Sequence, residues 1–239
     1  MRFGIAVFPG TWSDRDCKHA VELAGHEAVM LWHKDRDLHD TDCVILPGGF
    51  AYGDYLRAGA VARFAPLMES VAEFANAGGL VWGICNGFQI LCEAHLLPGA
   101  LTRNTSLEFR CVPTWLRVET VDNVFTAGCA RGDVLQIPVS HGEGRFVADD
   151  ETLDILEREQ RVAFRYVRRD GSAVENASPN GSMHDIAGIV NERRNVLGMM
   201  PHPERACEAL LGSSDGMRLF NSVAKMVSRD GAMPVAAVS

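Results

Sequence analysis

Short continuous apolar runs mark the first half of the chain, at residues 2–8, 28–32, 43–46 and 80–84. Runs without polar alternation are typical of strands that are covered on both faces of a sheet. Before the last of these runs, residues 60–77 carry apolar side chains at spacings of three and four, which predicts an amphipathic helix. Strands that alternate with helices predict an α/β fold with a doubly wound, mostly parallel sheet.

Local signals indicate where the helices of this half begin and end. Ser13 followed by Asp16 resembles a capping box and predicts a helix that ends near Gly25. Pro66 lies inside the helical pattern of residues 60–77, and it either kinks that helix or marks its true start.

The pattern changes in the second half of the chain. Extended segments at residues 109–118 and 134–139, with turn residues between them, predict an antiparallel extension of the sheet. Two further apolar runs, 186–191 and 196–200, flank a short polar stretch and indicate a hairpin. We expect a last helix over residues 216–227 to close the domain.

The composition is that of an ordinary globular protein. The chain has 239 residues, of which 47% are hydrophobic and 23% are charged, and its formal net charge is −8. We expect a single domain over residues 1–230 and a loosely held tail over residues 231–239. The negative charge argues against nucleic-acid binding, and no stretch is long and apolar enough to predict a membrane span.

Lysine and cysteine usage excludes further classes of protein. The lysines are Lys18, Lys34 and Lys225, and none follows a glycine, so the chain has no GxxxxGK[ST] phosphate loop. The seven cysteines form no CxxC pair, and the histidines form no cluster with metal-ligand spacing, so we expect no metal site. A reducing cytoplasm fits an odd number of scattered cysteines best.

The segment Gly83-Ile84-Cys85-Asn86-Gly87 lies between a predicted strand and an apolar helix expected over residues 88–96. It has the pattern of a nucleophile elbow with cysteine in place of serine. A helix N-terminus favours the thiolate form of Cys85, and the N–H of Asn86 would point at a developing oxyanion. The alternative is that Cys85 is one more inert buried cysteine. The flanking glycines favour a functional role, because a merely buried side chain does not require them.

A second candidate segment contains His202 and Glu204, which follow an apolar strand and alternate with prolines. Residues before proline favour extended geometry, in which side chains two apart face the same side. One imidazole and one carboxylate on one face suit a base and the group that orients it. Taken alone, a proline-rich loop with two exposed polar residues is the commoner interpretation. The position of the segment at the end of a strand, like that of Cys85, strengthens the functional one.

A third segment, Pro47-Gly48-Gly49-Phe50, also ends a predicted strand. It could bring a second backbone N–H, that of Gly49, to the oxyanion. The alternative is an ordinary glycine-rich turn.

Together with 141–146 (HGEGRF) and 179–182 (PNGS), these segments resemble the class I, or triad, glutamine amidotransferase family, over nearly the whole chain and in the same order. The stretch Asn86-Gly-Phe-Gln89 is similar to the branch of that family that serves de novo purine synthesis. The resemblance implies a flavodoxin-like α/β fold. It implies that Cys85 is the nucleophile, His202 the general base and acid, and Glu204 the orienting carboxylate. It also implies an oxyanion hole made by Gly49 and Asn86, and glutamine contacts from Gln89, Asn104, Ser106 and Phe109. Ser178 stands where the family often has Asn.

The resemblance also implies partners. A glutaminase alone would waste its ammonia, and the chain has no evident ATP or ribonucleotide site. The family implies a large ATP-dependent synthetase subunit that receives the ammonia, often with a small bridging subunit. ATP and Mg²⁺ are expected in that partner, and no cofactor is expected in this chain.

Two other classes of function compete with this interpretation. One is a thiol hydrolase on the same fold, such as a glutamyl hydrolase or a protease-like relative, which the His-x-Glu spacing and the Gly87-Phe-Gln89 stretch disfavour. The other is a non-catalytic stress-response or chaperone module with an oxidisable cysteine at the elbow. Such a module would have no use for His202 and Glu204.

Overall fold

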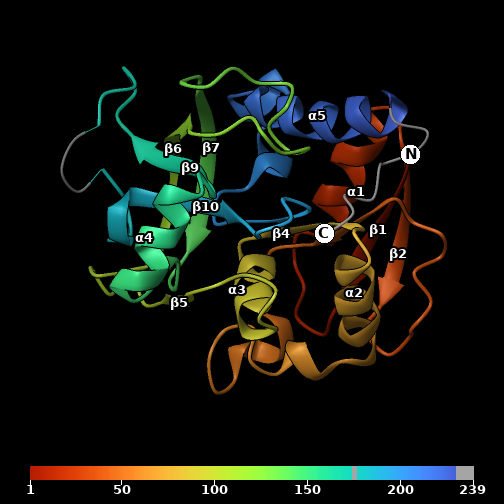
Figure 1. Cartoon of the computed structure of the whole chain (residues 1–239). Coiled ribbons are helices and arrows are strands. Elements are labelled where there is room, and N and C mark those ends of the chain that lie inside the picture. Colours follow the sequence, from red (N-terminus) through yellow and green to blue (C-terminus); the bar gives the residue numbers. More distant parts are fainter. Residues whose placement is uncertain (174–176, 230–239) are drawn as a thin grey trace, which may run out of the picture.

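The computed structural model describes residues 1–173 and 177–229, and within them one large mixed sheet dominates the fold (Figure 1). Its strand order is β2-β1-β3-β4-β11-β10-β9-β6-β7, and β5 and β8 form a separate pair. The strands are β1 (Arg2–Val7), β2 (Glu27–Trp32), β3 (Cys43–Leu46), β4 (Leu80–Ile84), β5 (Ala100–Thr102), β6 (Arg110–Val118), β7 (Val134–His141), β8 (Arg145–Val147), β9 (Val162–Val167), β10 (Ile186–Val190) and β11 (Val196–Met199). The helices are α1 (Asp14–Leu23), α2 (Pro66–Asn76), α3 (Asn86–Glu93), α4 (Asp150–Arg158) and α5 (Asp215–Arg229).

The half of the sheet formed by β2, β1, β3, β4 and β11 is parallel throughout. Helices α1 and α5 lie on one face of it, and α2 and α3 lie on the other (Figure 1). Both faces of these strands are therefore covered, which is why β3 and β4 are apolar and buried along their whole length. This strand order confirms the predicted flavodoxin-like, doubly wound sheet.

The other half of the sheet is antiparallel, as predicted. Strands β10 and β11 form the expected hairpin, and β6 pairs with β7 over residues 110–117. Strand β9 completes the extension between β10 and β6, and together with α4 it was not predicted. The N-cap of α4 is Asp149, whose carboxylate accepts a hydrogen bond from Thr152 N–H at 2.8 Å.

One detail of the predicted helices is wrong, and one open alternative is decided. Ser13 does precede α1, but its hydroxyl makes no capping bond and instead accepts one from the Arg205 guanidinium at 2.8 Å. Of the two alternatives for Pro66, the structure confirms that it marks the true start of the helix predicted over 60–77, in the first turn, where the missing N–H costs nothing. The predicted tail over 231–239 lies outside the described residues.

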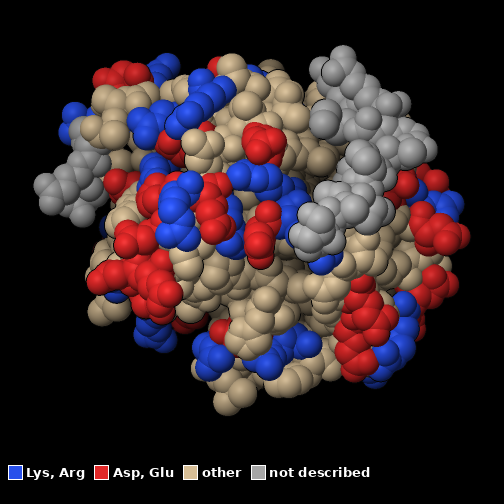
Figure 2. All heavy atoms as spheres, viewed as in Figure 1, with Lys and Arg blue, Asp and Glu red and all other residues tan. Residues whose placement is uncertain are grey.

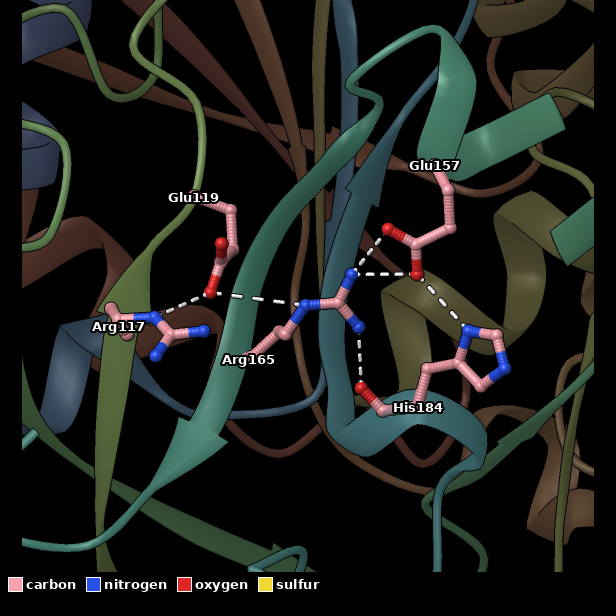
Figure 3. A network of polar contacts seen from close by, with 5 residues as sticks. All are labelled: Arg117, Glu119, Glu157, Arg165 and His184. Atoms are coloured by element: carbon pink, nitrogen blue, oxygen red, sulfur yellow. Dashed lines mark hydrogen bonds and ion pairs between the residues drawn. The ribbon is translucent and has the colours of Figure 1, made fainter. Parts of the chain in front are cut away.

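A polar network ties the antiparallel extension together (Figure 3). Arg165 on β9 binds the carboxylate of Glu157 on α4 through two contacts of 2.6 Å, and it donates to the backbone oxygen of His184 at 2.5 Å. On its other side, Arg165 lies 3.8 Å from Glu119, which also accepts from Arg117 on β6. The network joins β6, β9 and α4, although partly exposed ion pairs of this kind contribute only about 0–1 kcal/mol each.

The surface carries charges of both signs. Figure 2 shows Lys and Arg interspersed with Asp and Glu on the face viewed, without a broad basic field. None of the helices within the described residues is long and apolar enough to cross a membrane.

Candidate active site

Cys85 lies at a sharp corner between β4 and α3. Its backbone has φ 52° and ψ −106°, a conformation that costs a residue with a side chain about 1–3 kcal/mol. The glycines on either side are required by close packing: a Cβ at Gly87 would lie 1.9 Å from the backbone oxygen of Leu46, and one at Gly83 would lie 2.7 Å from the backbone of Gly87. The corner is therefore fixed by backbone packing, and it holds the thiol at the carboxyl ends of the parallel strands.

His202 reaches the same place from β11, which is the parallel neighbour of β4. Its backbone N–H donates to the carbonyl of Pro138 on β7 at 2.8 Å. Its ring Nδ1 lies 2.6 Å from Oε1 of Glu204, and both side chains are almost completely buried. Residues 203–205 form a short 3₁₀ helix, so the predicted extended geometry is wrong. The imidazole and the carboxylate nevertheless meet as expected.

Gly48 shows how close the cysteine and the histidine are. A Cβ built on this glycine would lie 2.6 Å from Cε1 of the His202 ring and 3.4 Å from Cβ of Cys85. Both side chains therefore pack on the same glycine. The Cys85 thiol also lies 3.7 Å from the backbone oxygen of Ser140 on β7.

The charges of the site favour a protonated imidazole. Burial alone would lower the pKa of His202, but the negative charges of Glu204 and Cys85 and the hydrogen bond with Glu204 outweigh burial and raise it to about 10. This environment stabilises the imidazolium form of His202. The buried second oxygen of Glu204 has no hydrogen-bond partner among the described residues.

Gly49, the predicted second oxyanion donor, occupies a backbone position that requires glycine. Its φ is +148°, and a Cβ there would lie 2.6 Å from the backbone nitrogen of Trp12, so only glycine fits. An isolated β-bridge joins the segment before Trp12 to the segment of Gly49. Its hydrogen bonds are donated by the N–H groups of Trp12 and Phe50 to the backbone oxygens of Gly48 and Gly10. The N–H of Gly49 takes no part in that bridge.

Asn86 begins α3 next to the nucleophile. Its backbone N–H belongs to the first turn, where helical N–H groups have no partner within the helix. Its side chain accepts from Ala51 N–H at 3.0 Å and donates to Gln89 at 2.9 Å and to Asp54 at 3.2 Å. The side chain of Asn86 thus ties the loop after β3 to the helix that follows Cys85.

Two small cavities adjoin the cysteine and the histidine. The first, about 260 Å³, is lined by Cys85, Gln89, Phe109, Asp54, His141 and Glu143, with Gly49, Phe50, Ser140 and Gly142. The second, about 230 Å³, contains His202, Trp12 and Arg205 and shares with the first Gly49, Phe50, Phe109 and Ser140. A larger groove of about 830 Å³ lies beside β6 and β9 and is lined by none of the predicted site residues. The candidate active site therefore lies at the two small cavities, not at the larger groove.

The four residues predicted to contact glutamine lie in different places. Gln89 and Phe109 line the first cavity, and the Gln89 amide donates to the backbone oxygen of Glu143 at 2.6 Å. Asn104 is fully buried, and its amide donates to the backbone oxygens of Glu108 and His141. Ser106 is exposed, and neither it nor Asn104 lines the cavity.

Sequence reasoning assigned no role to three ionisable residues of this cavity: Asp54, His141 and Glu143. His141 and Glu143 belong to the 141–146 segment that carried part of the family resemblance, which is the signal that could have pointed to them. Among the described residues, no group of three or more His, Cys, Asp and Glu side chains could hold a metal ion.

The fold and the arrangement of Cys85, His202 and Glu204 are those of a glutamine amidotransferase. Residues 1–226 match the family model of the CobB/CobQ-like glutamine amidotransferase domain. Similar proteins include the phosphoribosylformylglycinamidine synthase subunit PurQ of Koribacter versatilis, 54% identical over 93% of this chain and 97% of the relative. A PurQ of Thermus thermophilus is 55% identical over 96% of this chain and 100% of the relative.

Solved structures agree with the sequence comparison. The structure of PurLQS from Thermotoga maritima contains a chain that superposes with a TM-score of 0.83 at 43% identity, over 95% of this chain and 98% of that one. A putative GMP synthase protein from Thermoplasma acidophilum shares the fold, with a TM-score of 0.61 at 13% identity, over 96% of this chain and 94% of that one. The chain therefore belongs to the glutamine amidotransferases and, within them, to the family of the PurQ subunits.

Proposed function

We propose that this chain is the glutaminase subunit of a phosphoribosylformylglycinamidine synthase. It would hydrolyse glutamine to glutamate and ammonia, and a synthetase subunit would use the ammonia to convert formylglycinamide ribonucleotide to the amidine with ATP, in purine biosynthesis. The observation that carries this proposal is that Cys85 and His202 pack on the same glycine between two adjoining cavities, with Glu204 bound to the His202 ring, in a chain similar to PurQ subunits over more than nine-tenths of its length.

The mechanism follows from the geometry of these groups. The Cys85 thiolate attacks the side-chain amide carbon of glutamine, and the N–H groups of Gly49 and Asn86 stabilise the oxyanion that forms. The His202 imidazolium gives its proton to the departing ammonia, which leaves a glutamyl thioester. His202 then takes a proton from water as the water hydrolyses the thioester to glutamate. Glu204 orients the ring and stabilises its charged form.

Gln89 and Phe109 are the proposed glutamine contacts that line the cavity, while Asn104 and Ser106 would act indirectly, without touching glutamine. The Asn104 amide donates to the backbone oxygen of His141, and its Oδ1 accepts from Gly144 N–H at 3.0 Å. We propose that Asn104 holds the cavity wall and does not touch the substrate.

The partners of this chain are proposals as well. A chain of Thermotoga maritima PurLQS is 43% identical to this one, which supports assembly with other subunits. We propose a large synthetase subunit that holds ATP and Mg²⁺, a small bridging subunit, no cofactor in this chain, and a cytoplasmic location. Ammonia reacts as a nucleophile only when it is unprotonated, so we expect it to pass to the partner without contact with bulk water.

The cysteine assignment can be tested with an electrophilic glutamine analogue. We expect the analogue to label wild-type chain once, at Cys85, and to leave Cys85→Ala unlabelled and without glutaminase activity. Cys111→Ala is the matched control, because Cys111 is the exposed cysteine among the described residues and should be irrelevant to both readouts. Normal ammonia release by Cys85→Ala would contradict the proposal.

The coupling to a synthetase is tested separately. The chain mixed with a synthetase subunit, ATP and formylglycinamide ribonucleotide should form the amidine with glutamine as nitrogen donor. Cys85→Ala should support the reaction with added ammonia but not with glutamine. Amidine formation from glutamine by the Cys85→Ala complex would refute the mechanism.

A further inference from the structure

Two carboxylates face the cavity beside Cys85, and the mechanism above uses neither. Asp54 comes from the loop after β3, and Glu143 from the turn after β7. Both segments are anchored to the first turn of α3. Asp54 accepts from the side chain of Asn86 at 3.2 Å, and the backbone oxygen of Glu143 accepts from the side chain of Gln89 at 2.6 Å. The Asp54 carboxylate and the backbone that carries Glu143 are thus held near Cys85 by the same end of α3.

The cavity supplies no positive charge to balance these two groups. No Lys or Arg side chain lines it within the described residues. Arg103 forms an ion pair with Glu143, with Nε 3.5 Å from Oε1, but its side chain is 77% exposed and does not line the cavity. Burial and the nearby His202 lower the pKa of the third titratable wall residue, His141, to about 4, so His141 is neutral at pH 7.

The mutual repulsion of the pair is visible in its protonation. Burial and then the charge of Glu143 raise the pKa of Asp54 to about 6, against the smaller opposite effect of its hydrogen bond with Asn86. A carboxylate whose ionisation is opposed by burial and also by a second carboxylate is stabilised by a cation placed between the two.

Glutamine carries such a cation at the end opposite its reacting amide. When the amide carbon is at Cys85, the α-ammonium group lies elsewhere in the same small cavity, whose acidic wall residues are Asp54 and Glu143. We infer that Asp54 and Glu143 together bind the α-ammonium group of glutamine and so make the site select an amino-acid amide over a simple carboxylic amide. This inference rests on the proposed glutaminase function, and it adds which residues make that function specific for glutamine.

The inference is tested with two substrates that differ only in this group. Glutaramate has the side-chain amide and the carboxylate of glutamine but no α-ammonium. We expect the kcat/KM ratio of glutamine to glutaramate to be high in wild-type chain assembled with its synthetase, and to fall by about 10-fold or more in Asp54→Asn and in Glu143→Gln. The ratio should fall because kcat/KM for glutamine decreases, while kcat/KM for glutaramate should change much less.

The variants are chosen to keep the structure. Asn at position 54 retains an oxygen that accepts from Asn86, and Gln at position 143 leaves the backbone oxygen that Gln89 uses. Glu108→Gln is the matched control, because Glu108 is an exposed acid near the cavity that does not line it. It should leave the ratio at the wild-type value.

A pH series separates recognition from simple structural support. The ratio of the two substrates cancels any effect of pH on Cys85 and His202, which both substrates share. In wild type the ratio should rise as pH increases through about 6, because Asp54 ionises there. This step should move to lower pH in Glu143→Gln, where the repulsion is gone, and disappear in Asp54→Asn.

The outcomes separate this inference from the function on which it rests. A wild-type complex that cannot hydrolyse glutamine would refute both. An active wild type whose ratio is unchanged in either variant, or shows no step near pH 6, would overturn the inference and leave the glutaminase function standing.

Discussion

The two segments that meet at the active site are held in different ways. The corner at Cys85 is fixed by backbone packed on backbone, since a Cβ at Gly87 would lie 1.9 Å from the oxygen of Leu46. His202 is fixed by polar contacts: the carboxylate of Glu204 at 2.6 Å and the carbonyl of Pro138 at 2.8 Å. Both segments follow neighbouring parallel strands, so the sheet supplies their approach and these local contacts supply their precision.

This difference predicts how each segment fails. Backbone atoms in a packed corner cannot move aside separately, so any added atom at the corner disturbs the fold itself. A polar contact can be removed with little change of shape, so the histidine segment should lose function while the fold persists. Substitutions in the histidine segment should therefore reduce activity without reducing stability. Substitutions at the cysteine corner should reduce both.

The largest expected effect is that of Gly87→Ala. Alanine in a helix is ordinarily more stable than glycine by about 0.5–1 kcal/mol, but here the clash with Leu46 should reverse the sign. We expect a loss of about 3 kcal/mol or more, a melting temperature lower by ~5–10 °C, and no detectable glutaminase activity.

Gly78→Ala is the control for this variant. Gly78 has φ +97° and open space around its Cβ position, so alanine there costs only about 1 kcal/mol of backbone strain. Thermal unfolding of both variants checks the comparison. If Gly87→Ala were as stable as Gly78→Ala, the corner would not be fixed by backbone packing.

Glu204→Gln should leave the fold intact and reduce kcat by about 10²–10⁴-fold. The carboxylate and Cys85 hold the pKa of His202 above its usual value, so loss of the negative charge lowers this pKa. The proton donor for departing ammonia is then lost at lower pH, and the alkaline limb of the kcat profile should move to lower pH.

A second His–Glu pair supplies the control. His19 and Glu208 lie 2.7 Å apart, nearly the same separation, but on the surface. Glu208→Gln should change neither kcat nor its pH profile, because exposed pairs contribute little. An unshifted alkaline limb in Glu204→Gln would show that Glu204 does not set the protonation of His202.

The parallel half of the sheet was more predictable from the sequence than the rest, and for a physical reason. Strands β3 and β4 are covered on both faces, so each gives an unbroken apolar run that stands out in the sequence. Strand β9 is interrupted by the half-buried Arg165, and helix α4 has a strongly polar face and a cap that depends on a single aspartate. Ser13 resembled a cap because local spacing says nothing of Arg205, its actual partner from a distant segment.

The residues of the candidate site also differ in how far the sequence could predict them. The Cys85 corner was predictable because glycines at fixed spacing are a local steric requirement. The meeting of His202 with Glu204 was predicted from an extended backbone, and it occurs although residues 203–205 form a 3₁₀ helix instead. Asp54 and Glu143 were not predictable, because each becomes a cavity wall only through the packing of two loops that lie far apart in the sequence.

Gly48→Ala sits where the two segments touch and should have the smallest of these effects. The new Cβ would meet Cε1 of His202 at 2.6 Å and Cys85 only at 3.4 Å, which is ordinary contact. The ring is a side chain and can shift by some tenths of an ångström, so we expect the melting temperature to change by less than about 2 °C. Because a misplaced base costs up to about 10²-fold, kcat should fall by ~10–10²-fold with KM little changed. A drop in stability as large as that of Gly87→Ala would mean that His202 is held as rigidly as the cysteine corner, and the contrast between the two segments would fail.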